Sequence, residues 1–139
     1  MAYTRRLANL ATWQLSEAAA RAHRILREYL DGENANGYEY RVLAALGDLG
    51  QISQVDLGRA TGLDRSDITH TVRKLEARRF VSRESDPRDA RRSLVELTEA
   101  GRRMLVRLDK VIQLVQDEVF MPITDAEITV LLGLLRRLS

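Results

Sequence analysis

Apolar residues recur every three or four positions over most of this chain, with polar residues between them. That spacing is typical of α-helices that turn one face inward. Gly32 stands where the first helix should end and is available for a left-handed cap. The pattern predicts one continuous first helix and five more, over residues 7–31, 38–49, 53–60, 65–78, 98–121 and 124–138.

Helix-capping side chains stand at several of the predicted helix starts. Ser53, Asp64 and Thr98 each precede an apolar helical pattern and can accept a hydrogen bond from a free backbone N–H. Thr124 with Glu127 three residues later forms a capping box. These residues therefore support the predicted starts independently of the apolar spacing.

The pattern changes between the helices in the second half of the chain. Short apolar runs at Phe80–Arg83 and Leu94–Leu97 predict two strands, and Ile52 predicts a very short third one. Residues 85–92 lie between the two runs as a turn-rich hairpin tip that holds three arginines. A helix-turn-helix followed by a two-stranded wing explains this order of elements. The expected fold is mainly α with a small β-wing.

This order also predicts how the chain is divided. We expect a winged helix-turn-helix DNA-binding domain at residues 37–97, flanked by dimerisation helices at residues 1–36 and 98–139. The terminal helices carry broad apolar stripes that a small winged domain could not cover alone. Leu131 and Leu135 are expected at the resulting interface between two copies.

Composition limits the classes of function. The 139 residues contain no cysteine, which excludes disulfides, thiolate metal sites and thiol-based redox sensing. His23 and His70 are far apart in sequence, so we expect no metal and no other cofactor. No apolar run approaches the roughly 20 residues that span a membrane, and residues 1–13 lack an apolar signal core. We expect a soluble cytoplasmic protein with no membrane partner.

Basic residues are concentrated in one part of the chain. The net charge is only +2, but residues 59–92 hold ten Lys or Arg against six Asp or Glu. Such a local excess is typical of an anion-binding surface. The alternative is an ordinary solvated charged face.

The helix at residues 65–78 has the side chains expected of a DNA-reading helix. With Ile68, Val72 and Leu75 inward, hydrogen-bonding and cationic side chains occupy the opposite and flanking faces. An α-helix fits the major groove, where arginine can bind guanine and hydroxyls can contact bases or phosphates. Asp67 is acidic and would repel phosphate, but its carboxylate could accept a hydrogen bond from a cytosine amino group or orient a neighbouring arginine. The alternative is a solvent-exposed face, and the candidate contacts are Arg65, Ser66, Asp67, Thr69, His70, Arg73 and Lys74.

Two neighbouring segments could bind the DNA backbone and the minor groove. Ser53 and Gln54 start the preceding helix and could lie near a phosphate. A hairpin tip can enter the adjacent minor groove, which is narrow and electronegative at A·T tracts. A contact between Asp89 and Arg91 would limit the arginine's rotamers, although the pair could also merely stabilise the hairpin. The candidate wing contacts are Arg88, Asp89, Arg91 and Arg92.

These segments resemble the MarR family of winged helix-turn-helix transcription regulators. The stretch Asp86-Pro87-Arg88-Asp89-Ala90-Arg91, with Val95-Glu96-Leu97-Thr98 and Gly101-Arg102 after it, is similar to the family's wing signature. That signature is an Asp-x-Arg followed by Val-x-Leu-Thr-x-x-Gly. Ser53–Leu57, Leu75-Glu76 and Val81–Arg83 also match, and the resemblance covers nearly the whole chain.

The chain departs from the family pattern at two positions. Arg79 stands after the recognition helix where the family usually has glycine. A left-handed conformation there would cost arginine about 1 kcal/mol, so the turn is expected to differ. Ala90 replaces a common basic residue, while Arg88 and Arg92 keep the tip basic.

The resemblance implies an obligate homodimer whose first helix and last two helices interleave with those of the partner. Two recognition helices would then enter successive major grooves of a pseudo-palindromic operator in double-stranded DNA. It also implies that residues 64–74 contact bases and phosphates, and that Arg91 enters the minor groove while Asp89 holds it.

The resemblance further implies regulation by a small molecule. Family members often release DNA when a small anionic or phenolic ligand binds between the dimer region and the DNA-binding lobe. Packing of the helices is the alternative role for the aromatic candidates. The candidate effector contacts are Trp13, Tyr38, Tyr40 and Arg102.

The hypothesis is a sequence-specific DNA-binding transcription regulator. We expect a repressor, because repressors are more common than activators in the family that the chain resembles. One alternative is a winged helix that binds proteins and not DNA. An enzyme is the other alternative, but we find no glycine-rich phosphate loop, metal-ligand cluster or cysteine nucleophile. Ser66, Asp67 and His70 share one helix and face outward, so no catalytic residue is assigned.

Overall fold

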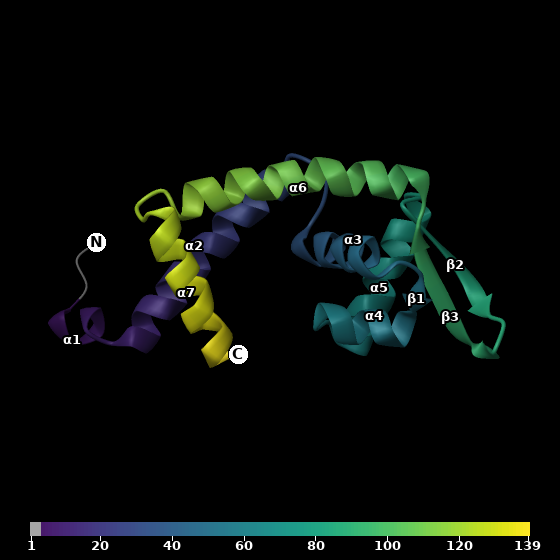
Figure 1. Cartoon of the computed structure of the whole chain (residues 1–139), viewed down its shortest axis with the longest axis horizontal. Coiled ribbons are helices and arrows are strands. Elements are labelled where there is room, and N and C mark those ends of the chain that lie inside the picture. The colour runs from purple at the N-terminus through teal and green to yellow at the C-terminus, as the bar shows by residue number, and fades with distance from the viewer. Residues whose placement is uncertain (1–3) are drawn as a thin grey trace. The chain divides into compact units, whose positions relative to one another are not determined.

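The computed structural model describes residues 4–139, and the first three residues of the predicted dimerisation region lie outside the described residues. The fold is mainly α with a three-stranded antiparallel sheet, as the sequence predicts. The elements, labelled in Figure 1, are α1 (Arg5–Ala8), α2 (Ala11–Asp31), α3 (Gly37–Leu49), β1 (Ile52–Ser53), α4 (Gln54–Thr61), α5 (Arg65–Ala77), β2 (Val81–Asp86), β3 (Asp89–Leu97), α6 (Glu99–Val119) and α7 (Asp125–Leu138).

The chain forms two compact units. The helical unit consists of the residues up to Tyr29 together with Ile112–Ser139, and the winged unit consists of Leu30–Val111. The long helices α2 and α6 each contribute residues to both units. The winged unit contains the helix-turn-helix of α4 and α5 and the β2–β3 hairpin (Figure 1).

The winged unit encloses a core of its own. Leu43 of α3, Leu57 of α4 and Leu75 of α5 are almost completely buried, as is Val95 of β3. The sheet has the order β1-β3-β2, so β3 is paired on both sides. Since α3, α4 and α5 pack together and β3 contacts α3 and α4, the core fixes both the recognition helix and the root of the wing.

The predicted caps are present at the helix starts. The side chains of Ser53, Asp64 and Thr124 each accept a hydrogen bond from the backbone N–H three residues later. Gly62 ends α4 in the left-handed conformation at φ 70°. A second capping box, formed by Asn36 and Glu39, starts α3 and was not among the predicted caps. The Asn-x-x-Glu spacing was the available signal.

The prediction of one continuous first helix was wrong. Asn9 closes α1 because its N–H and that of Leu10 both bond to the Leu7 carbonyl, so the regular ladder stops there. The left-handed residue after α2 is Asn34, at φ 53°, and not Gly32. The N–H of Ala35 returns to a carbonyl in the last turn of α2, which places the turn over Asn34.

The wing strands are longer than predicted. β2 and β3 together occupy most of the expected hairpin tip, and only Pro87 and Arg88 connect them. Ser85 pairs with Ser93, and the register shifts between Ser85 and Asp86. The alternation of apolar residues stops before the strands do, because an exposed hairpin continues through backbone hydrogen bonds alone.

The turn between α5 and β2 corrects a second expectation. Arg79 does adopt the left-handed conformation, at φ 64°, although it is not glycine. The Arg79 N–H bonds to the Glu76 carbonyl at 2.9 Å, and the Thr98 hydroxyl donates to the Arg79 carbonyl at 2.7 Å. These bonds offset the conformational cost of about 1 kcal/mol.

Gly101 explains the Thr-x-x-Gly spacing of the wing signature. The Thr98 oxygen accepts from the Gly101 N–H at 3.0 Å, and the Thr98 N–H donates to the Phe80 carbonyl at 3.0 Å. A Cβ atom on Gly101 would overlap that Phe80 carbonyl. The start of α6 therefore approaches the turn between α5 and β2 as closely as only glycine allows.

Candidate DNA-binding surface

The outer face of α5 carries most of the predicted base contacts. Ile68, Thr71, Val72 and Leu75 are buried on its inner face. Asp67 and Lys74 do not contribute to the hollow on the outer face, although both were predicted contacts. That hollow is lined by Arg65, Ser66, Thr69, His70 and Arg73.

A larger cleft of about 860 Å³ lies beside this face, between α4, α5 and β3. Its lining includes four arginines from these three elements, Arg59, Arg65, Arg91 and Arg92. Asp64 also lines the cleft, but its carboxylate accepts from the Asp67 N–H at 2.8 Å and caps α5. The cleft can therefore hold an extended polyanion along the edge of the helix-turn-helix.

Gln54 and Thr69 contact each other across the helix-turn-helix. The Thr69 hydroxyl donates to the Arg65 carbonyl at 2.7 Å and accepts from Gln54 Nε2 at 3.3 Å. Gln54 Oε1 is buried and has no hydrogen-bond partner among residues 4–139. The two candidate DNA contacts thus join α4 to α5.

Ser53 and Arg92 form a second internal contact. The buried Ser53 oxygen accepts from the Asp56 N–H at 3.1 Å and from Arg92 Nη2 at 2.8 Å. The Arg92 guanidinium is also 3.7 Å from the Asp56 carboxylate. Arg92 therefore fastens β3 to the start of α4, which the sequence did not indicate.

Asp89 and Arg91 form the predicted carboxylate–guanidinium contact on the wing. Arg91 Nε and Nη2 donate to the two Asp89 oxygens at 3.1 and 3.3 Å. Hydrogen bonds from the Arg91 side chain, and then from its backbone, lower the pKa of Asp89. Arg91 is otherwise almost fully exposed, so the contact orients a guanidinium that points into solvent.

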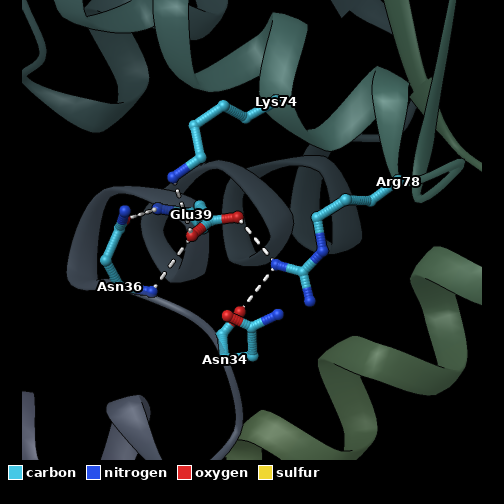
Figure 2. Close-up of polar contacts among 5 residues, drawn as sticks. All are labelled: Asn34, Asn36, Glu39, Lys74 and Arg78. Carbon is cyan, nitrogen blue, oxygen red and sulfur yellow. Dashed lines mark hydrogen bonds and ion pairs between the residues drawn. The ribbon is translucent and has the colours of Figure 1, made fainter.

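Two acidic residues hold α5 in place, and neither was among the residues predicted to have a role. Glu76 near the end of α5 accepts from Arg83 of β2 through Nε at 3.2 Å and Nη2 at 3.0 Å. Glu39 of α3 is buried and faces Lys74 of α5 and Arg78, the residue that caps the end of α5 (Figure 2). The recognition helix is thus bound to both the wing and α3 by ion pairs.

The four candidate effector contacts have different surroundings. Trp13 is part of the helical unit and is half-buried, while Tyr38, Tyr40 and Arg102 are in the winged unit. Tyr38 is exposed, with the Arg41 guanidinium 5.6 Å from its ring centre.

The other two candidates in the winged unit have acidic partners. The Tyr40 hydroxyl donates to Asp109 at 2.7 Å, and burial together with this bond raises the pKa of Tyr40 to about 12. Arg102 lies 3.8 Å from Glu99.

Residues 4–139 contain no group of three or more His, Asp or Glu side chains placed to hold a metal ion. Within that same range, no helix has the length and apolar character needed to cross a bilayer.

Comparison with known proteins identifies relatives of this fold and sequence. A sequence model of the MarR family matches residues 34–92. The HTH-type transcriptional repressor NicR of Pseudomonas putida is 35% identical over 91 residues, which are 66% of this chain and 58% of NicR. The chain thus matches less than two thirds of that repressor's own length.

Solved structures extend the likeness to almost the whole chain. The PcaV transcriptional regulator of Streptomyces coelicolor, solved with its natural ligand, is 31% identical, and the alignment covers 99% of this chain and 96% of PcaV with a TM-score of 0.83. BpsR of Bordetella bronchiseptica, whose DNA binding is regulated by 6-hydroxynicotinic acid, is 28% identical. The alignment covers 90% of this chain and 95% of BpsR with a TM-score of 0.83.

Proposed function

This chain belongs to the MarR family of transcription regulators, and from that premise we propose a specific role. It is a homodimeric, sequence-specific regulator that binds double-stranded DNA, represses transcription and is released by a small-molecule effector. Its relatives are transcription regulators and not enzymes. The proposal includes a cytoplasmic location, because a transcription regulator must reach the chromosome.

The outer face of α5 is the observation that carries the proposal. Five hydrogen-bonding or cationic side chains line one hollow on a helix whose opposite face is buried. In the major groove, Arg65 and Arg73 could bind guanine, while Ser66 and His70 could contact bases or phosphates. The adjacent arginine-lined cleft supplies the charge that a phosphate backbone needs.

The wing would add a minor-groove contact. The Arg91 guanidinium is exposed and is oriented by two bonds to Asp89, so it loses little rotamer freedom on binding. Arg88 at the hairpin turn is exposed next to it. Ser53 and Arg92 bond to each other and so hold the wing against the start of α4. They would contribute to DNA binding by keeping the wing in place.

The surface of the helical unit supports the homodimer. Large apolar side chains that are rarely left in water are exposed there, including Leu114, Met121, Val130, Leu132, Leu134 and Leu138. Leu131 and Leu135, predicted at the interface, are half-buried. A second copy of the chain would cover this surface, and a two-fold dimer would require a pseudo-palindromic operator.

The relatives support repression and release by an effector. NicR is a repressor, and the DNA binding of BpsR responds to 6-hydroxynicotinic acid, a small aromatic acid. We extend this to a small anionic or phenolic effector for the present chain. Such a ligand acts only if it binds the DNA-incompetent state more tightly. The proposed contacts are Trp13, Tyr38, Tyr40 and Arg102.

Fluorescence anisotropy tests the proposal directly. Purified protein would be titrated onto duplex DNA from upstream of its own gene and onto a scrambled duplex, across a salt series. We expect tighter binding to the first DNA, with an affinity that falls steeply with salt. Equal binding to both duplexes would refute sequence specificity at this DNA. Absence of binding to either at low salt would refute the DNA-binding role and favour a protein-interaction module.

A further inference from the structure

A buried carboxylate lies at the start of α3, facing the recognition helix. The Glu39 side chain is only 3% exposed. Its Oε1 accepts from the Asn36 N–H at 3.1 Å, and its own N–H bonds to the Asn36 side chain at 2.9 Å. Figure 2 shows Asn36 beside Glu39, whose carboxylate faces Lys74 and Arg78. The capping box fixes where the carboxylate lies.

Two cations, one from the last turn of α5 and one from its C-cap, meet this carboxylate. Arg78 Nη1 is 3.1 Å from Glu39 Oε2, and Lys74 Nζ is 3.9 Å from Glu39 Oε1 (Figure 2). Lys74 and Arg78 are four residues apart, so they project from the same side of the helix. Neither of them lines the hollow on the outer face of α5, which Arg73 does line.

The two cations are held to different degrees. Arg78 is 29% exposed, donates to the Asn34 carbonyl at 2.7 Å and lies 4.9 Å from the Phe80 ring centre. Lys74 is 46% exposed, and Glu39 is its one ion-pair partner among residues 4–139. Arg78 is thus fixed in the structure, whereas the lysine stem can move its ammonium group toward another anion.

We propose that Glu39 is a positioning residue that restrains Lys74 and thereby weakens the sequence-independent part of DNA binding. This inference rests on the proposed function. A phosphate contact from lysine adds affinity for any DNA sequence. The buried carboxylate competes with DNA phosphates for Lys74, so part of that affinity is offset. Arg73, on the outer face, has no ion pair among the described residues and contributes its full charge.

The experiment uses the full chain and a mixed-sequence 30-base-pair duplex, with anisotropy measured across a salt series. Glu39→Gln keeps the capping box, since glutamine serves at that position, and removes the charge. Lys74→Gln would be made in the wild type and in Glu39→Gln. Arg73→Gln, in the same two backgrounds, is the matched control for loss of one charge from α5.

We expect Glu39→Gln to bind this duplex about threefold more tightly and with a steeper salt dependence, by up to roughly 0.9 in log–log slope per protomer. Lys74→Gln should weaken binding by less than about twofold in the wild type and by about fivefold or more in Glu39→Gln. Arg73→Gln should weaken DNA binding by the same factor in the wild type and in Glu39→Gln. A purely structural role for Glu39 would produce no tighter binding.

Equal costs of Lys74→Gln in the two backgrounds would overturn the inference while leaving the proposed function intact. Absence of DNA binding by the wild type would overturn both. If circular dichroism shows that Glu39→Gln is unfolded, the two single variants in the wild-type background test the inference instead. There, Arg73→Gln should lower the salt slope by about 0.9 per protomer and Lys74→Gln by less than half as much. Equal decreases would refute the restraint.

Discussion

The winged unit and the helical unit are both built mainly from amphipathic helices, but they bury their apolar residues to different degrees. The winged unit encloses Leu43, Leu57 and Leu75 almost completely. In the helical unit, Ile25 and Val115 are buried, but α7 contains no buried residue. The winged unit therefore has a complete core within one chain, whereas the helical unit exposes apolar surface that the proposed second copy would cover.

The largest expected effect comes from breaking the exposed surface of the helical unit. Leu134→Asp should abolish dimer formation at micromolar concentration, because the proposed interface would lose two leucine side chains and would have to desolvate two carboxylates. The expected loss is on the order of 5 kcal/mol of association free energy. Size-exclusion chromatography with light scattering would report the change in mass.

The matched control for this prediction is in the winged unit. Leu49→Asp introduces the same charge at an apolar residue of similar exposure, 56% against 48% for Leu134. It should leave the dimer intact. A Leu134→Asp dimer as stable as the wild type would show that the partner does not cover α7.

The second prediction concerns the close packing of the winged unit. Gly101→Ala should destabilise the fold by about 3 kcal/mol or more, because the new methyl group would overlap the Phe80 carbonyl. Gly58→Ala in α4 makes only ordinary contacts and should change stability by no more than about 1 kcal/mol. Urea denaturation followed by circular dichroism measures both. Similar midpoints for the two variants would contradict the packing at the wing root.

The third prediction compares basic residues of the two units. Arg91→Ala should weaken binding to a selected operator by about 1–3 kcal/mol with the fold unchanged, because the guanidinium oriented by Asp89 is lost. Arg137→Ala removes the same charge from α7 in the helical unit and should have little effect. Anisotropy titrations at fixed salt give both values. An unchanged affinity for Arg91→Ala would eliminate the wing contact.

Much of the fold was predictable because its signals are local in sequence. Apolar spacing located the helices from α3 onward, and Ser53, Asp64 and Thr124 marked three of their starts. The break at Asn9 and the true length of the wing strands were missed. Both depend on backbone hydrogen bonds that leave no apolar pattern in the sequence.

The candidate site was predictable as a set of residue types but not as a set of contacts. The outward face of α5 follows from helical periodicity, so Arg65, Thr69 and Arg73 were identified together. The bond from Arg92 to Ser53 and the ion pair of Lys74 with Glu39 join residues 39 and 35 positions apart. Such contacts depend on packing between elements, and a single sequence does not reveal it.

The smallest expected effect concerns a polar contact inside the winged unit. The Tyr40 hydroxyl donates to Asp109, and its pKa is raised to about 12 by burial and by this bond. A raised pKa means that the folded state favours the protonated phenol. The resulting stabilisation is complete below pH 10, the ordinary range of tyrosine, and is lost as the pH rises toward 12.

Tyr40→Phe removes this titration together with the hydrogen bond. Because Tyr40 is only partly buried, the variant should lose no more than about 1 kcal/mol at pH 8. Its stability should approach that of the wild type between pH 10 and 12, as the wild type loses its own contribution. Urea midpoints at pH 8, 10 and 11.5 would show the convergence. Tyr38→Phe is the matched control, because it removes an exposed tyrosine hydroxyl and keeps the bond from Tyr40 to Asp109. Its midpoints should therefore stay parallel to those of the wild type. Parallel midpoints for Tyr40→Phe as well would show that the bond to Asp109 does not stabilise the winged unit in solution.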